Sequence, residues 1–221
     1  MKHCSRFVAI VFAVAATFTP AAAAQAVHVV DGDTLTIGER VFRLHGIDSP
    51  EAGQRCSRRG GGDWRCGRVA TDALKRLVEG RTVQCDDRGQ DDYDRTIAVC
   101  EADGINVNAE MVIEGNAWAF RKFSLDFASL EDTARASGLG IWQAPTQTAE
   151  EYRAVRWEVA AQEAPSGCPI KGNISDGGRI YHAPWSPWYD RTKVSIEQGE
   201  RWFCSEREAL DAGWRAPYWG S

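Results

Sequence analysis

Seven cysteines constrain this chain of 221 residues more than any other feature. The first of them, Cys4, lies in a segment where Lys2 and Arg6 precede an apolar run that ends in alanines up to Ala26. This order of basic, apolar and small residues is typical of a cleaved signal peptide, so we expect residues 1–26 to be removed. The apolar run is too short for a comfortable membrane span, and we expect no stable membrane insertion after cleavage.

The six cysteines that remain form an even set, which indicates three disulfides in an exported protein. No Cys-x-x-Cys pair occurs among them, which disfavours a metal site. The sequence alone allows many pairings, and the spacing suggests sequential ones. We therefore expect a periplasmic or secreted bacterial protein with the bonds Cys56–Cys66, Cys85–Cys100 and Cys168–Cys204.

Composition limits the class of protein further. A hydrophobic content of 43% excludes a disordered chain, and a formal net charge of -5 argues against binding nucleic acid by bulk electrostatics. Any contact with a polyanion must then come from one locally basic face.

Short segments rich in Val, Ile, Leu and Thr predict strands, and apolar residues at helical spacing predict helices. Strands followed by interleaved helices indicate a small β-barrel with packed helices, an α+β fold. The polar residues 146–165 predict a helical linker. Residues 166–221 are rich in Trp, and we expect them to be a small module that the Cys168–Cys204 bond stabilises. The expected strands are 27–31, 34–37, 40–46, 81–85 and 96–101, and the expected helices are 67–79, 106 or 108 to 115, and 124–137.

Three polar clusters in the first part of the chain can carry chemistry, although each alone also fits a turn or a solvated strand end. Arg43 lies in an otherwise apolar strand and requires an anionic partner. Asp33, Asp48 and Glu51 offer hard oxygen ligands, which suit Ca²⁺ or Mg²⁺. A cation, two arginines and a spare carboxylate are the groups needed to hydrolyse a phosphodiester. The clusters are residues 31–34, 43–51 and 92–95.

The order of five blocks resembles the thermonuclease, or staphylococcal-nuclease-like, family. The resemblance implies a five-stranded OB-fold nuclease domain over residues 27–145. It also implies a calcium-dependent nuclease that cleaves DNA and/or RNA with little sugar specificity, at the 5′ P–O bond, and the signal peptide adds the expectation that this nuclease is exported. The blocks are Val-Val-Asp-Gly-Asp-Thr, Arg-Leu-x-Gly-Ile-Asp-Ser-Pro-Glu, Asp-x-Tyr-Asp-Arg, Gly-x-Ala-Trp-Ala-Phe and Gly-Leu-Gly-Ile-Trp, between Val27 and Trp142.

The resemblance also implies a role for each matching residue. One Ca²⁺ ion is expected to bind Asp33, Asp48 and the backbone carbonyl of Ser49. Glu51 matches the acid that positions or deprotonates the attacking water. The arginines that match the phosphate-binding and transition-state-binding pair are Arg43 and Arg95.

Further residues are expected to contact the substrate. The resemblance assigns the terminal phosphate to Tyr93 and places Trp118 where bases stack, while Phe120 is equally compatible with the core. The basic loop with Arg58 and Arg59 either restores positive potential near the site or is a solvated insertion. Acidic residues over 86–94 should weaken the hold on nucleic acid.

His45 lies between Arg43 and Asp48, within the second cluster of predicted site residues. It could act as the base of a histidine nuclease, but no second His or Asn accompanies it at a suitable spacing. We therefore favour a packing or surface role for His45.

The C-terminal module resembles a sunset domain and, more faintly, zinc-binding DNA-repair modules. Cys168, His182 and Cys204 supply only three candidate zinc ligands, so the disulfide is favoured. Its tryptophans can form a core or bind a nucleic acid or a glycan.

Two alternatives to the enzyme remain open. One is a catalytically weak OB-fold module that binds single-stranded nucleic acid or an envelope polymer. The other is a structural protein that the C-terminal module anchors at the envelope. We expect a monomer whose partner is DNA and/or RNA.

Overall fold

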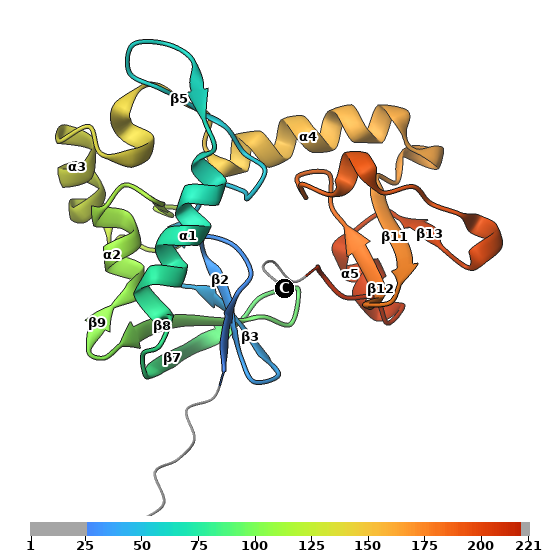
Figure 1. The fold of residues 1–221 in the computed structure, drawn as a ribbon, viewed down its shortest axis with the longest axis horizontal. Coiled ribbons are helices and arrows are strands. Elements are labelled where there is room, and N and C mark those ends of the chain that lie inside the picture. Colours follow the sequence, from blue (N-terminus) through green and yellow to red (C-terminus); the bar gives the residue numbers. More distant parts are fainter. Residues whose placement is uncertain (1–25, 218–221) are drawn as a thin grey trace, which may run out of the picture.

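The computed structural model describes residues 26–217 (Figure 1). The expected signal peptide therefore lies, apart from Ala26, outside the described residues. Between residues 26 and 217, no helix is both long enough and apolar enough to span a bilayer.

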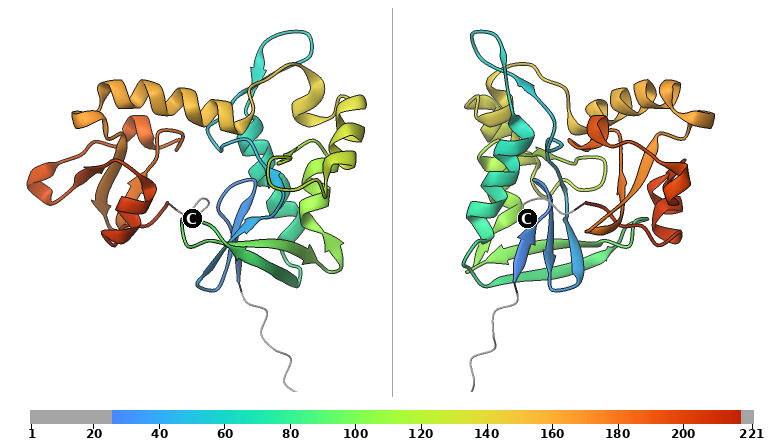
Figure 2. Two further views of the ribbon diagram at one scale, coloured as in Figure 1. Left: turned by 180° about the vertical axis from the view of Figure 1, so that it is seen from behind. Right: turned by 45° about the vertical axis from the view of Figure 1, so that its right-hand side comes forward.

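A curled sheet forms the first half of the structure (Figures 1 and 2). Its strands run in the order β1-β2-β3-β8-β7, and β9 pairs with β8. Only β3 and β8 are parallel among these pairs. This arrangement confirms the expected OB fold. The strands are β1 (Val27–Val29), β2 (Thr34–Ile37), β3 (Arg40–Leu44), β7 (Val83–Gln90), β8 (Thr96–Ala102) and β9 (Ile105–Asn106).

Helices cover the sheet and bury the main apolar core between them. Apolar residues at helical spacing give α1 one buried face, which includes Ala70 and Leu74. Met111 of α2 and Phe127, which directly precedes α3, complete the same core. The helices are α1 (Cys66–Val78), α2 (Val107–Ile113) and α3 (Ala128–Ala136), followed by the 3₁₀ helix η1 (Gly140–Gln143).

Two short strand pairs lie outside the main sheet. One pair places Trp118 opposite Asp48, and the other forms the hairpin between Cys56 and Cys66. The strands are β4 (Ile47–Asp48) with β10 (Trp118–Ala119), and β5 (Cys56–Ser57) with β6 (Asp63–Trp64).

Two boundaries differ from the sequence prediction by more than two residues. The fourth expected strand ended at residue 85, but β7 continues through the acidic stretch to Gln90. Backbone pairing with β8 continues there while the acidic side chains stay exposed at the sheet edge, so charge does not prevent the strand. The helix expected from residue 124 begins only at Ala128, because Ser124 accepts a hydrogen bond from the backbone N–H of Asp126 in a turn.

The remaining chain forms a helix and a second small sheet. The long helix α4 (Ala149–Glu163) begins with a capping box, in which Thr148 and Glu151 satisfy each other's backbone N–H groups. The sheet order is β12-β11-β13, and Trp157 of α4 packs against its core. The other elements are η2 (Pro165–Gly167), β11 (Ile170–Ser175), β12 (Gly178–His182), η3 (Tyr189–Arg191), η4 (Ile196–Gln198), β13 (Arg201–Phe203) and α5 (Glu206–Asp211).

The six cysteines between residues 26 and 217 form the three expected sequential pairs. The Cα–Cα distances are 5.6 Å for Cys56–Cys66, 4.1 Å for Cys85–Cys100 and 4.0 Å for Cys168–Cys204. In the second sheet, Cys168 and Cys204 are bonded to each other, and the ring nitrogens of His182 contact Ser186 and Asn173. The zinc alternative therefore lacks a ligand set there.

Asn108 connects α2 to β8 and to the turn that follows β3. Its Nδ2 donates to the carbonyl oxygens of His45 and Ala98, at 3.0 and 3.1 Å, and its Oδ1 accepts from the N–H of Cys100 at 2.9 Å. The side chain is fully buried. Water cannot replace these bonds when they are lost.

We predict that Asn108→Ala lowers the free energy of unfolding by about 2–4 kcal/mol, because it leaves buried backbone groups without partners. Asn106→Ala is a matched control, since Asn106 only caps α2 and its loss should cost about 1 kcal/mol. Urea unfolding of both variants gives the comparison. A loss at Asn108 no larger than that at Asn106 would contradict this account.

We also predict a pH dependence of stability from His182. Burial, with a smaller effect of Lys171, lowers the pKa of His182 to about 4. The unfolded chain binds this proton below about pH 6.5 and the folded chain only near pH 4, so the free energy of unfolding falls as the pH drops between these values. His182→Gln should show a smaller loss of stability between pH 7 and pH 5 in denaturant titrations. An equal loss in both proteins would show that His182 does not titrate in this way.

Candidate active site

The turn between β1 and β2 places Asp33 in the interior, where only 3% of the residue is exposed. Gly32 has no room for a side chain, because a Cβ there would overlap Ser49 Oγ. The turn therefore lies directly against Ser49, whose backbone N–H donates to Asp33 Oδ2 at 2.9 Å. Burial acts to raise the pKa of Asp33, but Arg43 and the Ser49 N–H outweigh it and lower the pKa.

Arg43 pairs with two carboxylates at once. Strand register places it opposite Thr34 on β2, next to Asp33. Its Nη1 lies 2.7 Å from Asp33 Oδ1, and its Nη2 lies 2.9 Å from Asp48 Oδ1. Burial acts to lower the pKa of Arg43, but the two carboxylates raise it, so this guanidinium stays charged. The anionic partner predicted for Arg43 is present.

Glu51 lies on a turn that its neighbours fix tightly. The fully buried Gln54 accepts from the N–H of Glu51 at 3.1 Å, and the N–H of Gln54 donates to the carbonyl of Glu51 at 2.6 Å. Gly67 at the start of α1 packs against the same carbonyl, and a Cβ there would overlap it. The backbone that carries the Glu51 carboxylate is therefore held from both sides.

The carboxylate of Glu51 meets a guanidinium from a distant part of the chain. Arg153 of α4 donates through Nη1 to Glu51 Oε1 at 2.7 Å. Burial raises the pKa of Glu51 to about 8 against the opposing effect of Arg153. Burial also raises the pKa of the neighbouring Asp48.

The loop between β7 and β8 carries Tyr93 and Arg95. The Asp91 carboxylate accepts hydrogen bonds from the backbone N–H groups of Tyr93 and Arg95. It also accepts from Arg95 Nε at 2.7 Å. The guanidinium of Arg95 lies 5.3 Å from the centroid of the Tyr93 ring. Asp91 therefore sets the conformation of the loop and the direction of Arg95.

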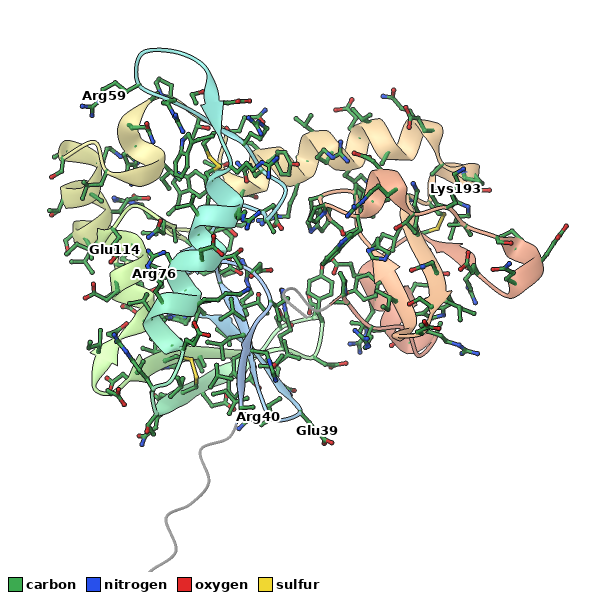
Figure 3. All side chains as sticks on the ribbon, in the orientation of Figure 1. Glu39, Arg40, Arg59, Arg76, Glu114 and Lys193 are labelled. Carbon is green, nitrogen blue, oxygen red and sulfur yellow. A yellow bond between two sulfur atoms is a disulfide. The ribbon has the colours of Figure 1, made fainter. Side chains whose placement is uncertain are left out.

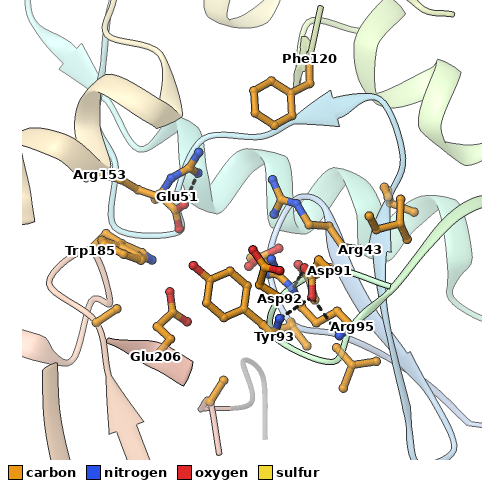
Figure 4. Close-up of a pocket in the computed structure, with 18 of the residues that line it drawn as sticks. Arg43, Glu51, Asp91, Asp92, Tyr93, Arg95, Phe120, Arg153, Trp185 and Glu206 are labelled. Atoms are coloured by element: carbon orange, nitrogen blue, oxygen red, sulfur yellow. Dashed lines mark hydrogen bonds and ion pairs between the residues drawn. The ribbon is translucent and has the colours of Figure 1, made fainter. Parts of the chain in front are cut away.

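Four of the predicted residues border one cleft of about 1020 Å³ (Figure 4), whereas Asp33, Asp48 and Ser49 are buried behind its surface. Arg43, Glu51, Tyr93 and Arg95 line it from the barrel side. Aromatic and charged residues beyond residue 150 form the opposite wall. That wall includes Arg153, Trp157, Tyr181, Trp185 and Glu206.

Direct contacts join the two walls. Arg207 of α5 donates to the carbonyl of Asp92 at 3.1 Å and to Asp94 Oδ2 at 3.2 Å. Beside it, Tyr181 Oη donates to Glu206 Oε2 at 2.8 Å, and burial raises the pKa of Glu206. The C-terminal segment therefore holds the loop that carries Arg95.

The donor chemistry of the cluster fits a hard divalent cation. Asp33 and Asp48 converge on the guanidinium of Arg43, so two carboxylates already share one cation. With the Ser49 carbonyl they supply the oxygen ligands that Ca²⁺ prefers. Across residues 26–217, however, no three His, Cys, Asp or Glu side chains are grouped so that they could hold a metal ion. Both oxygens of Asp48 instead accept hydrogen bonds from Arg153.

Comparison with known proteins shows which family the sequence matches. The family described as staphylococcal nuclease homologue matches residues 41–144, a range that contains Arg43, Asp48, Glu51 and Arg95 but not Asp33. An uncharacterized endonuclease of Escherichia coli O157:H7 is 36% identical over 123 residues, which cover 52% of this chain and 74% of that protein. The micrococcal nuclease of Shigella flexneri is 31% identical over 138 residues, which cover 55% and 74% of the two chains.

The chain belongs to the family of staphylococcal nuclease homologues. The predicted family is thus confirmed.

Two other matches of this nuclease homologue are informative. One relative is covered over a smaller share of its length, and one family matches the C-terminal part of the chain. The succinoglycan biosynthesis protein ExoI of Rhizobium meliloti is 38% identical over 125 residues, which cover 55% of this chain and 65% of ExoI, just under two thirds of its length. A second family, described as ArfC, matches residues 153–216. The resemblance of this segment to a sunset domain stays a prediction.

Three residues predicted to bind substrate do not line the cleft of the nuclease homologue. Trp118 is only 7% exposed and packs with Ile141 and the Cys56–Cys66 bond, in edge contact with Trp142. Trp118 lies in β10, opposite the buried Asp48 of β4. Phe120, two residues later, lines the cleft instead.

Arg58 and Arg59 also lie away from the cleft. Both belong to the exposed β5–β6 loop, and Figure 3 shows Arg59 on the outer side of the molecule. The backbone N–H of Arg59 contacts Gln143 Oε1 at 3.4 Å, so the disulfide-closed loop lies beside η1. Of the two interpretations of this loop, the solvated insertion fits its position better.

Sequence reasoning did not find the wall beyond residue 150. The sequence predicts α4 only as a helical linker. Charged residues lie on all sides of that helix, so nothing in the sequence distinguishes Arg153 as a site residue. The Trp-rich composition pointed to a core or a ligand surface without indicating that Trp185 faces the nuclease cleft.

We predict that Trp118→Ala lowers the free energy of unfolding by about 3–5 kcal/mol, because it leaves a cavity in a buried cluster. Phe120→Ala should cost less, since that ring is partly exposed at the cleft. Urea unfolding of the two variants decides between a core and a surface role. If Trp118→Ala is the milder change, the placement of Trp118 in the core is wrong.

Proposed function

We propose that this protein is an exported nuclease that hydrolyses phosphodiester bonds of DNA and/or RNA with little sugar specificity. The observation that carries the proposal is the convergence of Arg43, Glu51 and Arg95 on one cleft. The similar proteins named as an endonuclease and a micrococcal nuclease support it. Two guanidinium groups and a carboxylate that line one cleft are suited to this reaction.

In the proposed reaction, Arg43 and Arg95 bind the phosphate and stabilise the charge that develops on its oxygens. Glu51 orients or deprotonates a water molecule for attack in line with the 5′ P–O bond. A new P–O bond forms from the water, the bond to the 5′ oxygen breaks, and that oxygen takes up a proton. The products are a 3′-phosphate and a 5′-hydroxyl.

The proposal includes one Ca²⁺ ion held by Asp33, Asp48 and the Ser49 carbonyl. When bound, such an ion neutralises charge on the phosphate and orients its oxygens. The chain itself contributes the buried, converging carboxylates and Gly32, which allows the Asp33 turn to approach Ser49.

The substrate is proposed to reach the cleft with its phosphate near Arg95 and its terminal phosphate at Tyr93. Phe120 and Trp185 offer aromatic faces along the same cleft for bases. Acidic neighbours such as Asp91 and Glu206 oppose a second phosphate, so we expect tight contact with only a short stretch of the substrate.

Export and a monomeric state are part of the proposal. Three disulfides support an oxidising compartment, the periplasm or the exterior of a bacterium. The basic and apolar N-terminal sequence supports export by a signal peptide.

We predict that Glu51→Gln lowers kcat on single-stranded DNA and RNA by roughly 10²–10⁴-fold, because the amide cannot accept a proton from water. Glu158→Gln, an exposed substitution on α4, is the matched control and should leave kcat unchanged. Cleavage is measured with and without calcium, with product ends identified by mass.

Other outcomes would point elsewhere. A Glu51→Gln variant with the rate of the unchanged protein would remove Glu51 from the mechanism. Binding of single-stranded nucleic acid without cleavage at any calcium concentration would favour the alternative of a catalytically weak OB-fold module.

A further inference from the structure

Arg153 occupies the carboxylate cluster as a cation. Its Nη2 lies 3.0 Å from Asp48 Oδ2, and its Nη1 lies 2.7 Å from Glu51 Oε1. Both nitrogens also lie within 3.3 Å of Asp48 Oδ1. One guanidinium thus contacts both oxygens of Asp48 and one oxygen of Glu51, with 23% of its side chain exposed.

The start of α4 fixes Arg153 relative to Glu51. Gln54, which holds the Glu51 turn, also donates through Nε2 to the carbonyl of Gln147 at 2.9 Å. The helix then begins at the Thr148 capping box, and Ala149 is fully buried. The same glutamine therefore positions both partners of the ion pair.

The C-terminal segment holds α4 on its other side. Arg156, one turn after Arg153, donates to the carbonyl of Pro184 at 2.9 Å and to Asp190 Oδ1 at 3.0 Å. The rings of Trp157 and Trp185 lie 6.2 Å apart. The position of the Arg153 guanidinium thus depends on residues far beyond the part of the chain that matches the nuclease family.

This guanidinium uses the same oxygens that a divalent cation would need. Asp48 accepts from Arg43 and Arg153 together, so neither of its oxygens is without a donor. A second cation at Asp48 would have to displace Arg153 or lie beside it, and two like charges at contact distance repel in a buried site. Uptake of a divalent ion and the Arg153 ion pairs therefore oppose one another.

We propose that Arg153 is the tethered cation of the Asp48–Glu51 pair and competes there with the divalent ion. The affinity for that ion is then set by α4 and the C-terminal segment, together with the ligands themselves. This inference rests on the calcium site of the proposed function. It assigns α4 a part in the active site in addition to its place between the two sheets.

Isothermal titration calorimetry with calcium chloride, on the full chain with its disulfides oxidised, tests the competition without any measurement of cleavage. Arg153→Ala should bind Ca²⁺ on the order of tenfold more tightly than the unchanged protein, as expected for two coupled binding events. Arg153→Lys should lie between them, because an ammonium group cannot bridge both carboxylates as a guanidinium does.

A charge-matched control is Arg68→Ala, which removes one positive charge from an exposed position on α1. It should bind Ca²⁺ as the unchanged protein does. Calcium should also raise the Tm of Arg153→Ala more than that of the unchanged protein. If Arg153→Ala does not fold, the intermediate affinity of Arg153→Lys still tests the inference.

Two results would overturn the inference and leave the proposed nuclease to be judged separately. Equal calcium affinity in the unchanged protein, Arg153→Lys and Arg153→Ala would show that Arg153 does not compete. No binding to any of these proteins would show that the cluster is not a calcium site. Cleavage that depends on Glu51 would in either case still support a nuclease.

Discussion

The ion pairs that Asp48 makes with Arg43 and Arg153 connect the barrel to the C-terminal part of the chain. A carboxylate buried in this way is stable only with a cation beside it. Arg43 is supplied locally, by strand register, and Arg153 comes from a helix about one hundred residues away in sequence. The position of α4, and of the sheet that packs on it, is thus linked to the charge balance of the cleft.

Local patterns predicted the parts of the site that lie within one stretch of chain. Arg43 in an apolar strand, Asp33 at a turn and Glu51 after a proline each carry a signal in their immediate neighbours, and the structure brings them together. The same is true of the barrel strands and of α1, where periodicity sets which residues are buried. The length of β7 was not predicted, because its second half is acidic and a run of acidic residues is typical of a loop. An exposed strand at the edge of a sheet nevertheless tolerates such charges.

What sequence patterns did not predict depends on contacts between distant segments. Trp118 and Phe120 lie two residues apart and differ in role: Trp118 belongs to β10, which pairs with β4, whereas Phe120 lies beyond the end of that strand. Arg58 and Arg59 belong to a basic loop that could contact phosphate, but the Cys56–Cys66 hairpin places this loop beside η1. Arg153 is one of many charged residues on α4, and only the tertiary structure shows that it meets Glu51.

The most direct test of this charge balance is a pair of crystal structures of the oxidised full chain, one without divalent ions and one soaked in calcium chloride. We expect the guanidinium of Arg153 within hydrogen-bonding distance of Asp48 and Glu51 in the first. In the second, we expect an ion bound to Asp33 and Asp48, and the guanidinium of Arg153 no longer in contact with Asp48 and Glu51. An ion bound while Arg153 keeps its contacts, or an Arg153 side chain in solvent in both crystals, would contradict the account.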